Sequence, residues 1–449
     1  MASHSLPEAD RFSAVNLIAD PLYGYIEITK GGSTEPGERT LLDDPWLQRL
    51  RRIHQLQSAW WVFPSAEHSR FVHLLGTMHL ASLFAHRIDA SLRDAFPDAP
   101  SPACVEETLR LAGLLHDVGH GPFGHFFDQE VLATWHLDHE DIGRWLVENQ
   151  LAETIRGLRS SPSGVFDEGE SVDPRWVAWV MADAGISGYE PPGWLAACKP
   201  ILCGPATVDN LDYVRRDAYM CGISLGPVDV QRLIHYSFIT DGTMALHMHA
   251  AGALQMFLAS RLYMYTQVYH HRTGRRFDLS MQEIFADTIA LLLPGNPLDH
   301  PDDYLQLTDW AVLEAVHRWG RSPRDSEERR LGEAWGRLLR RDLHWHLAYE
   351  TIAHRDVDVS TLRDRLFAET PEVTARVQVD VVSAKIAPHN PMADHGFVAL
   401  YDPIKGTVER HHTAEMIERL PQHNQLVRVF TDDVQAIPAL HRAAQRLLS

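Results

Sequence analysis

The sequence has few cysteines, no long apolar run and fewer basic than acidic residues. Only 4 of the 449 residues are cysteine, and no C-x-x-C pair occurs, so neither a disulfide framework nor a paired-thiol motif is indicated. No apolar segment approaches the ~18–20 residues that a membrane-spanning helix needs. The first residues do not resemble a secretory signal. These absences predict a reduced, cytoplasmic protein without a membrane segment.

The shortage of basic residues also limits the partners. Lys and Arg number 41 against 60 Asp and Glu, a formal net charge of −19. This balance argues against broad nucleic-acid binding, whose affinity comes from many phosphate contacts. A small polyanionic ligand needs only a local group of arginines, so this balance does not exclude such a ligand. Hydrophobic residues make up 45% and charged residues 22%, a composition typical of a globular protein.

The hydrophobic periodicity predicts a mainly α-helical fold with a short N-terminal β-hairpin and a small C-terminal α/β lobe. We expect an N-terminal arm over 1–40, a helical core over 41–290 and a C-terminal lobe over 291–449. Residues 20–28 alternate as in a hairpin arm, and strands are expected at 376–386, 396–402 and 426–433. Helices are expected at 43–57, 70–88, 104–118, 120–135, 138–149, 173–184, 205–221, 226–237, 250–271, 413–419, 434–448 and over most of 279–360.

Residues 113–128, GLLHDVGHGPFGHFFD, place ionisable side chains in an otherwise apolar stretch. His116 and Asp117 are adjacent at the expected end of a helix, where both can turn toward one ion. Imidazole and carboxylate together suit Mg, Mn, Fe, Co, Ni or Zn. An isolated pair of this kind is more often a capping aspartate beside a buried histidine. Here, however, His73 on an earlier helix and Asp209 on a later helix supply two further ligand types.

This order of helices, with His, then His-Asp, then Asp, resembles the HD phosphohydrolase superfamily. Longer strings resemble the deoxynucleoside triphosphate (dNTP) triphosphohydrolases, which include the SAM-and-HD-domain type and the dGTPase-like bacterial enzymes. The likeness runs from about residue 15 to residue 449, and we expect no SAM domain before it. The strings are DPLYGYIEI, PWLQRLRRIHQL, VFPSAEHSRFVHLLG, LLHDVGHGPFGH, DHED, VDNLDYVRRD, LYMYTQVYHHRTG, DYLQLTDWAVLEAV and LVRVFTDD.

The resemblance implies a divalent-metal site and a group of catalytic residues. His125 with Asp128 would activate or stabilise the nucleophile, His120 would contact the reacting phosphate, and His139 would protonate the leaving oxygen with support from Glu140. Each of these histidines alone is also typical of a packed polar residue, and Asp209 of a helix N-cap. The implied metal ligands are His73, His116, Asp117 and Asp209.

The resemblance also implies a nucleotide cavity. Arg70 would meet a phosphate, Tyr269 would stack on the sugar and Asp217 would bind the 3′-hydroxyl; the tyrosines could equally be core residues. At position 210 this sequence has Asn in place of the family's lysine, which Arg215 could replace. Position 265 is Tyr where the vertebrate enzyme has His. The implied substrate-binding residues are Gln55, Leu56, Arg70, Asn210, Tyr213, Asp217, Arg261, Tyr265, Tyr269 and Arg272.

A regulatory nucleotide site is a further expectation from the resemblance. Asp43, Gln48 and Arg51 match residues that read guanine, and an acceptor and a donor of this kind suit the edge of that base. In contrast, Asn16 stands where the family has a phosphate-binding lysine, and residues 246–254 lack the basic residues of a second activator site. Asp43 as a helix cap and Arg51 as a surface residue explain the same pattern.

The implied reaction is metal-dependent hydrolysis of a dNTP to a deoxynucleoside and inorganic triphosphate, with GTP or a dNTP as a possible activator. A homodimer or homotetramer is expected from the family. Three alternatives stay open on the sequence alone. The first is a phosphohydrolase acting on another nucleotide or phosphate ester. The second is a nucleotide-sensing regulatory or defence protein with little turnover. The third is a di-iron oxygenase of the HD type, in which His120 and His139 would bind a second ion.

Overall fold

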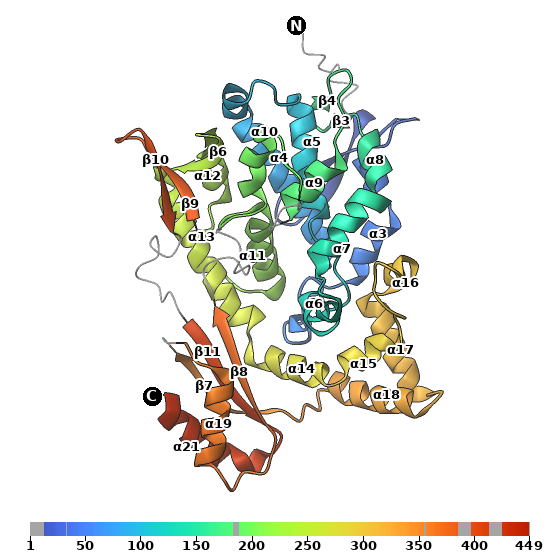
Figure 1. The fold of residues 1–449 in the computed structure, drawn as a ribbon, viewed down its shortest axis with the longest axis vertical. Coiled ribbons are helices and arrows are strands. Elements are labelled where there is room, and N and C mark those ends of the chain that lie inside the picture. The colour runs from blue at the N-terminus through green and yellow to red at the C-terminus, as the bar shows by residue number, and fades with distance from the viewer. Residues whose placement is uncertain are drawn as a thin grey trace.

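A computed structural model describes residues 13–32, 34–182, 188–353, 356–384, 397–412 and 424–448. The fold is mainly helical, as predicted (Figure 1). The expected N-terminal hairpin is confirmed: β1 (Val15–Asp20) pairs antiparallel with β2 (Gly24–Thr29). The Asp20 carboxylate closes its turn by accepting hydrogen bonds from the backbone N–H groups of Leu22 and Tyr23.

Three helices at the centre bring distant parts of the chain together: α4 (Arg70–Ala95), α5 (Pro102–Leu115) and α11 (Val208–Cys221). Their close packing requires a glycine. A Cβ at Gly76 of α4 would lie 1.9 Å from Oδ1 of Asp212 on α11, far inside van der Waals contact. The largest hydrophobic cluster surrounds these helices and runs from Ile26 to Leu343, with Leu400 added from a later strand.

The remaining helices cover this centre, and α14, α15, α17 and α18 lie below α6 in the view of Figure 1. Within the described residues, none of the helices is both long and apolar enough for a bilayer crossing. Their bounds are α2 (Glu38–Leu42), α3 (Pro45–Gln48), η1 (Arg49–Arg52), η2 (Ala59–Trp61), α6 (His125–Glu130), η3 (Leu132–Trp135), α7 (His139–Trp145), η4 (Leu146–Gln150), α8 (Ala152–Gly157), α9 (Pro174–Met181), α10 (Gly193–Cys198), η5 (Lys199–Ile201), α12 (Val230–His235), η6 (Met248–Ala250), α13 (Ala251–Met264), η7 (Tyr265–Tyr269), α14 (Arg272–Gln282), α15 (Phe285–Ala290), α16 (Pro301–Gln306), α17 (Asp309–Arg321) and α18 (Ser326–Leu339).

The C-terminal strands belong to two separate sheets. β7 (His346–Ala353), β11 (Asn424–Thr431) and β8 (Val377–Ala384) form an antiparallel sheet in that order, and it packs with α19 (Val359–Glu369) and α21 (Ile437–Leu448), which follows the short helix η8 (Val434–Ala436). β9 (Phe397–Asp402) and β10 (Thr407–His412) instead join β5 (Ser237–Thr240) and β6 (Thr243–His247). The link is a parallel pairing in which Leu246 faces Leu400. β3 (Ser160–Ser161) and β4 (Gly164–Val165) make a small separate hairpin.

Several predicted elements need correction. The helix expected over 43–57 ends at Arg52, because the chain from Ile53 pairs with residues 68–70: the Gln55 N–H donates to the His68 carbonyl, and the Arg70 N–H donates to the Ile53 carbonyl, each at 3.0 Å. Residues 346–353, which belong to the helical region expected over 279–360, form β7, whose backbone pairs with β11. The sequence does not predict the strands β3, β4, β5, β6 and β10. The helix expected at 413–419 lies outside the described residues.

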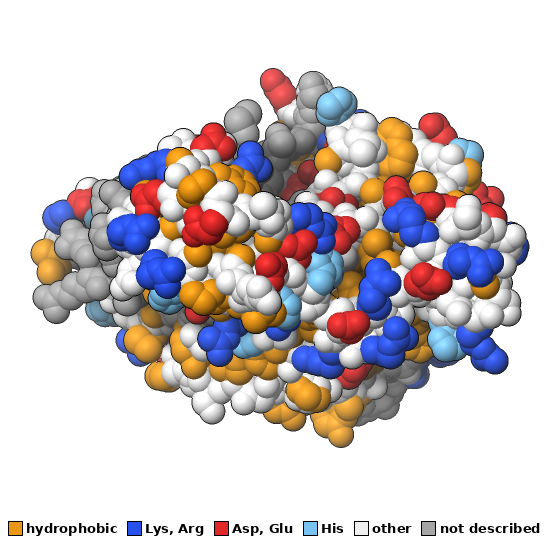
Figure 2. Space-filling model, turned by 90° about the horizontal axis from the view of Figure 1, so that it is seen from below, with side chains coloured by type: hydrophobic (Ala, Val, Ile, Leu, Met, Phe, Trp, Pro, Cys, Tyr) orange, Lys and Arg blue, Asp and Glu red, His pale blue; other side chains and the backbone are white. Residues whose placement is uncertain are grey.

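The described surface mixes charges of both signs. Seen from below in Figure 2, acidic and basic side chains are interspersed over the face, and hydrophobic side chains lie between them. Among the residues described, no continuous basic tract covers this face.

Candidate active site

The four predicted metal ligands meet where α4, the end of α5 and the first turn of α11 come together. Ligand atoms of His73, His116 and Asp117 all lie within 4.8 Å of one another. Asp209 joins them, with its Oδ1 3.1 Å from His73 Nε2 and 3.5 Å from His116 Nε2. The adjacent pair can converge because α5 ends at Leu115, and His116 and Asp117 stand in the turn that follows.

Hydrogen bonds on the far side of each imidazole ring orient both histidines toward this centre. His73 Nδ1 lies 2.8 Å from Asp212 Oδ2, and His116 Nδ1 lies 2.9 Å from the Gly113 carbonyl. A histidine that donates through Nδ1 keeps the Nε2 lone pair for a metal. His116 Nε2 is buried and has no hydrogen-bond partner among the described residues. An orphaned nitrogen between two carboxylates fits a divalent cation, so the donor set suits the predicted group.

Arg70, at the first residue of α4, contacts this centre directly. Its Nη1 lies 2.5 Å from Asp117 Oδ2, and its side chain is 4% exposed. Its Nε has no hydrogen-bond partner within the described part of the chain. A buried guanidinium with a spare donor beside a candidate metal-ligating carboxylate can also meet a phosphate oxygen.

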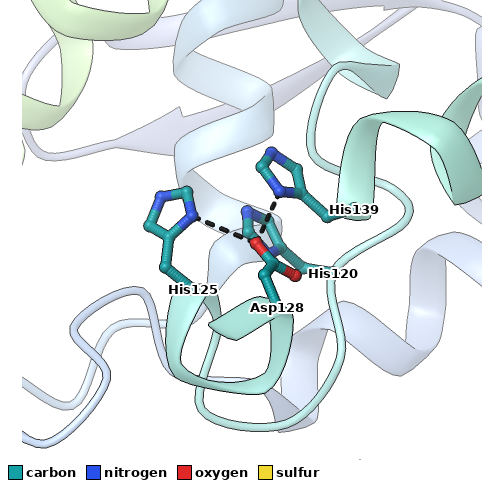
Figure 3. Close-up of side chains that lie close together, drawn as sticks. All are labelled: His120, His125, Asp128 and His139. Atoms are coloured by element: carbon teal, nitrogen blue, oxygen red, sulfur yellow. Dashed lines mark hydrogen bonds and ion pairs between the residues drawn. The ribbon is translucent and has the colours of Figure 1, made fainter. Parts of the chain in front are cut away.

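Four of the five predicted catalytic residues form a second cluster (Figure 3), and the fifth, Glu140, follows His139 in the first turn of α7. Ligand-type atoms of His120, His125, Asp128 and His139 lie within 4.8 Å of one another. Asp128 Oδ2 lies 2.7 Å from His139 Nδ1 and 3.2 Å from His125 Nδ1. The rings of His120 and His139 stack with centroids 3.7 Å apart. The nearest link to the metal centre joins His120 Nε2 to Asp117 Oδ1 at 3.4 Å.

Burial and neighbouring charges shift the pKa values of the second cluster in different directions. Burial lowers the pKa of His139, but the Asp128 carboxylate outweighs burial and raises the pKa to about 9. Burial, together with the charges of Arg70 and His139, holds the pKa of His120 well below its usual range. Burial raises the pKa of Asp128, but the neighbouring histidines, His139 first, hold this pKa well below its usual range. At neutral pH the cluster therefore combines an imidazolium, a neutral imidazole and a carboxylate.

The turn before His125 has an unusual backbone. Phe123 has φ 61° and Gly124 φ 57°. A left-handed phenylalanine is strained and persists only where surrounding contacts hold it. The Phe123 N–H donates to Asp309 Oδ1 at 2.8 Å. Because of this turn, the helix predicted over 120–135 begins only at His125, as α6.

Several predicted nucleoside contacts form a network along α11, α13 and η7. The Tyr269 hydroxyl donates to Asp217 Oδ2 at 2.6 Å, and His68 Nε2 lies 2.8 Å from Asp217 Oδ1. Arg261 donates through Nε to the Tyr213 hydroxyl at 3.0 Å, and its Nη1 has no hydrogen-bond partner among the described residues. The rings of Tyr265 and Tyr269 are 5.0 Å apart.

The other predicted substrate residues lie in different environments. Arg272 is exposed at the start of α14, and Leu56 lies within the hydrophobic core. Gln55 Oε1 and Asn210 Oδ1 are buried and lack hydrogen-bond partners in the described part of the chain, as expected of groups that meet a ligand. Arg215 lies with its guanidinium 5.4 Å from the Tyr23 ring, on the side of the hairpin.

The three predicted regulatory residues line one surface pocket of about 280 Å³. Arg51 donates through Nε to Gln48 Oε1 at 3.0 Å, and Asp43 pairs with Arg39 at 3.4 Å. The Arg51 guanidinium lies 3.8 Å from the centre of the Phe71 ring. Residues of both hairpin strands, Asn16 among them, also line the pocket, together with Arg39, Leu42 and Phe71.

Sequence reasoning missed Asp212, His68 and Asp309. Asp212 follows Asp209 by three residues and therefore shares its helix face, a spacing that could have signalled its position beside the metal centre. Besides orienting His73, it accepts hydrogen bonds from Tyr23 and Arg216. No local pattern pointed to His68 or Asp309, because their partners are distant in the sequence.

Comparisons with known proteins agree with this arrangement. The HD domain model matches residues 70–160, which hold His73, His116, Asp117 and the second cluster, and a model described as the HD associated region matches residues 228–386. The chain is 24% identical over 455 residues to the deoxynucleoside triphosphate triphosphohydrolase SAMHD1 homolog of Dictyostelium discoideum, which covers 96% of this chain and 80% of that protein.

Two further relatives carry no assigned function. The uncharacterized protein YwfO of Bacillus subtilis is 27% identical over 354 residues, covering 76% of this chain and 73% of its own. A hypothetical protein from Aquifex aeolicus has a solved structure that matches with a TM-score of 0.70 at 25% identity, covering 96% of this chain and 99% of that one. The chain therefore contains an HD domain followed by an HD-associated region, and it is distantly related over nearly its full length to the SAMHD1 triphosphohydrolases.

Proposed function

We propose that this protein hydrolyses deoxynucleoside triphosphates at the α-phosphorus, releasing the deoxynucleoside and intact inorganic triphosphate. The observation that carries the proposal is the adjacency of two clusters. The four-ligand centre of His73, His116, Asp117 and Asp209 touches a proton-transfer group whose nearest member, His120, lies 3.4 Å from Asp117. The distant relationship to the triphosphohydrolases supports the same reaction.

The metal centre and Arg70 would hold the reacting phosphate. A divalent cation bound there would supply Lewis-acid stabilisation of the charge that builds up on the phosphate oxygens. Arg70 has spare donors beside Asp117, and the neutral ring of buried His120 can accept or donate one hydrogen bond to the same group. Arg261, with an unpartnered Nη1, is suited to the outer phosphates.

Proton transfer would be shared between two histidines that meet on Asp128. His125, whose side chain is 65% exposed, stands where solvent can reach it and can orient or deprotonate a water molecule. His139 is an imidazolium at neutral pH, because the Asp128 carboxylate outweighs burial and raises its pKa to about 9. It can therefore give its proton to the 5′-oxygen as the bond to phosphorus breaks, and Glu140 adds to this stabilisation.

The deoxyribose would lie against Tyr269 and Asp217. Asp217 is almost completely buried, and Tyr269 and His68 occupy its two oxygens at 2.6 and 2.8 Å. A sugar hydroxyl could exchange with one of these hydrogen bonds. A tyrosine packed against the sugar ring would disfavour a 2′-hydroxyl, which favours dNTPs over ribonucleotides.

The pocket at Asp43, Gln48 and Arg51 would take a guanine nucleotide as an activator. The Asp43 carboxylate can accept from the N–H groups of guanine, and Arg51 can donate to its O6. Both side chains already lie on the pocket wall.

Product analysis tests the reaction. Purified protein is incubated with each dNTP, and with ATP, in Mn²⁺ or Mg²⁺, with and without GTP, and the products are separated by ion-exchange chromatography. We expect a deoxynucleoside and tripolyphosphate in equal amounts. Release of pyrophosphate or single phosphate without tripolyphosphate would refute the assignment. An Asp117→Asn preparation controls for contaminating phosphatases.

A further inference from the structure

Arg428 is a buried cation at the centre of the C-terminal sheet. It lies in the middle strand, β11, opposite Glu350 on β7 and Asp380 on β8. Its side chain is 3% exposed. The Nε of Arg428 donates to Glu350 Oε2 at 2.6 Å, and its Nη1 lies 3.8 Å from Asp380 Oδ2. Because directly opposite residues share a face of the sheet, the two carboxylates hold the guanidinium from both sides.

The guanidinium of Arg428 points out of the C-terminal lobe. Val427 and Val429, its neighbours in β11, pack with α19 and α21 in the lobe's own core. Successive side chains of a strand alternate between the two faces, so Arg428 lies on the opposite face, next to the junction of α13 and α14 (Figure 1). There its Nη2 donates to the carbonyl of His270 at 2.7 Å. A hydrogen bond from a buried guanidinium is among the stronger ones, and it holds this carbonyl in place.

His270 ends η7, the π-helical turn that carries Tyr265 and Tyr269. Its own N–H donates to the Tyr265 carbonyl at 2.9 Å. A π-helical turn of this kind is rare and occurs mostly at functional sites. Tyr269 directly precedes His270, and its hydroxyl donates to Asp217 Oδ2 at 2.6 Å. Any movement of the His270 carbonyl therefore moves the backbone that carries the Tyr269 ring.

A second series of contacts joins the same sheet to another part of the predicted nucleoside site. Asp380 accepts two hydrogen bonds from Arg275 of α14, from Nη2 at 3.0 Å and from Nε at 3.2 Å. Arg275 Nη1 also donates to Asp278 Oδ2 at 2.9 Å, and Asp278 Oδ1 accepts from Ser58 Oγ at 2.5 Å. Ser58 follows Gln55 by three residues. The sheet is thus connected to two separate segments that carry predicted substrate residues.

We propose that Arg428 is a positioning residue of the nucleoside site. Through the His270 carbonyl it sets the place of the Tyr269 ring, and through that ring it affects the discrimination between deoxyribose and ribose. The inference rests on the proposed function, which puts the sugar against Tyr269. It gives the C-terminal sheet a part in substrate selection, although Arg428 lies 158 residues after His270 in the sequence.

Arg428→Lys tests this role in the full-length protein. Lysine keeps the positive charge between the two carboxylates, so the sheet still folds, but it lacks the fork that reaches Glu350 and the His270 carbonyl together. We expect the kcat/KM preference for dATP over ATP to narrow by about threefold to tenfold, the scale of a small steric discrimination. The change should appear mainly in the KM for dATP.

Arg376→Gln is the matched control. It removes another ion pair between the same lobe and the helices, because Arg376 Nη1 lies 2.9 Å from Glu283 Oε1. That pair joins the end of α14 and does not reach η7. We expect Arg376→Gln to keep the wild-type preference for dATP.

A double-mutant cycle separates positioning from general damage to the lobe. In Tyr269→Ala there is no ring left to position, so adding Arg428→Lys should not narrow the dATP preference further. A merely structural role would lower the turnover of both nucleotides alike and leave their ratio unchanged. An unchanged ratio in Arg428→Lys, or a further narrowing in the double variant, would overturn the proposal.

A second readout needs neither nucleotide nor turnover. Hydrogen–deuterium exchange is followed in peptides covering residues 265–271. We expect faster exchange in Arg428→Lys than in the wild type, because the His270 carbonyl at the end of η7 is released, and wild-type exchange in Arg376→Gln. Unchanged exchange in Arg428→Lys would also overturn the proposal.

Calorimetric binding of the α,β-methylene analogues of dATP and ATP separates this proposal from the proposed reaction. If the wild type releases no tripolyphosphate, but Arg428→Lys narrows the affinity preference for the dATP analogue and speeds exchange at 265–271, the reaction is wrong and the positioning role stands. If the wild type releases tripolyphosphate while Arg428→Lys keeps the wild-type preference and exchange, the positioning role is wrong and the reaction stands.

Discussion

The Asp212 carboxylate lies behind His73, with Oδ2 2.8 Å from the ring Nδ1, so that Nε2 of the same ring faces Asp209. Asp212 is also the junction of two other contacts. It pairs with Arg216 on its own helix, and its Oδ1 accepts from the hydroxyl of Tyr23 on the N-terminal hairpin. The hairpin is thereby tied to the orientation of a candidate metal ligand.

Asp212→Asn should weaken metal binding while leaving all four candidate ligands in place. The amide keeps the shape but removes the charge that orients His73 and strengthens its basicity. We expect the dissociation constant for Mn²⁺ to rise by about 10- to 100-fold, the usual effect of losing such a partner. Competition with a fluorescent chelator measures this dissociation constant. Asp302→Asn, an exposed carboxylate on α16, should leave the constant unchanged. An unchanged constant in Asp212→Asn would contradict this role.

The pH profile of kcat should report His139. Burial lowers the pKa of His139, but Asp128 raises it to about 9, so the acid form is lost as pH rises through that value. We expect kcat to decline on the alkaline side near pH 9, and Asp128→Asn to move this decline toward lower pH. His139→Gln should lower kcat by about 10²- to 10⁴-fold and abolish the alkaline decline. His136→Gln, an exposed histidine three residues earlier, should keep the wild-type profile. If the alkaline decline of kcat persists in His139→Gln, a group other than His139 causes this decline.

Sugar selectivity should depend on Tyr269. Removing the ring in Tyr269→Ala opens space beside Asp217, whereas Tyr269→Phe removes only the 2.6 Å hydrogen bond. We expect Tyr269→Ala to narrow the kcat/KM preference for dATP over ATP by about tenfold, the scale of a small steric discrimination. Tyr269→Phe should keep most of that preference. Tyr263→Ala, an exposed tyrosine on α13, is the control. Equal selectivity in Tyr269→Ala and wild type would remove the tyrosine from the sugar site.

Stability toward acid should depend on His79 of α4. Burial, reinforced by the charge of Arg110, lowers the pKa of His79 to about 4. As the pH falls below 6.5, His79 therefore binds a proton in the unfolded chain but stays neutral in the folded chain until the pH nears 4. The contribution of His79 to the free energy of unfolding is complete above pH 6.5 and is lost as the pH falls toward 4.

The full effect is at most about 3.5 kcal/mol, since each pKa unit is worth about 1.4 kcal/mol. Urea unfolding at several pH values measures how steeply the free energy of unfolding changes with pH. We expect His79→Gln to flatten this slope between pH 6.5 and 4. An equally steep slope in the variant would place the acid sensitivity elsewhere.

The structure changed the sequence interpretation most where distant segments meet. Residues 43–57 have helical periodicity throughout, but the chain leaves the helix at Ile53 because residues 68–70 offer backbone partners. Residues 346–353 take a strand conformation because β11 pairs with them. In both cases the competing partner lies elsewhere in the sequence, so local periodicity does not reveal it. The proposed three-part domain division stays a prediction.

The sequence by itself determined the helical class of the fold, the N-terminal hairpin and the types of side chain at the candidate site, because periodicity and ligand chemistry are local properties. Its motifs also indicated that His73, His116, Asp117 and Asp209 belong together. Only the tertiary structure decided which atoms face the centre. Asp212 and the Gly113 carbonyl turn the two imidazoles inward, and Asp309 and Arg49 hold the neighbouring turn. Apart from the local contact between His116 and Gly113, those hydrogen bonds join residues that are distant in the sequence, so the directions of these buried donors are set only when the helices pack.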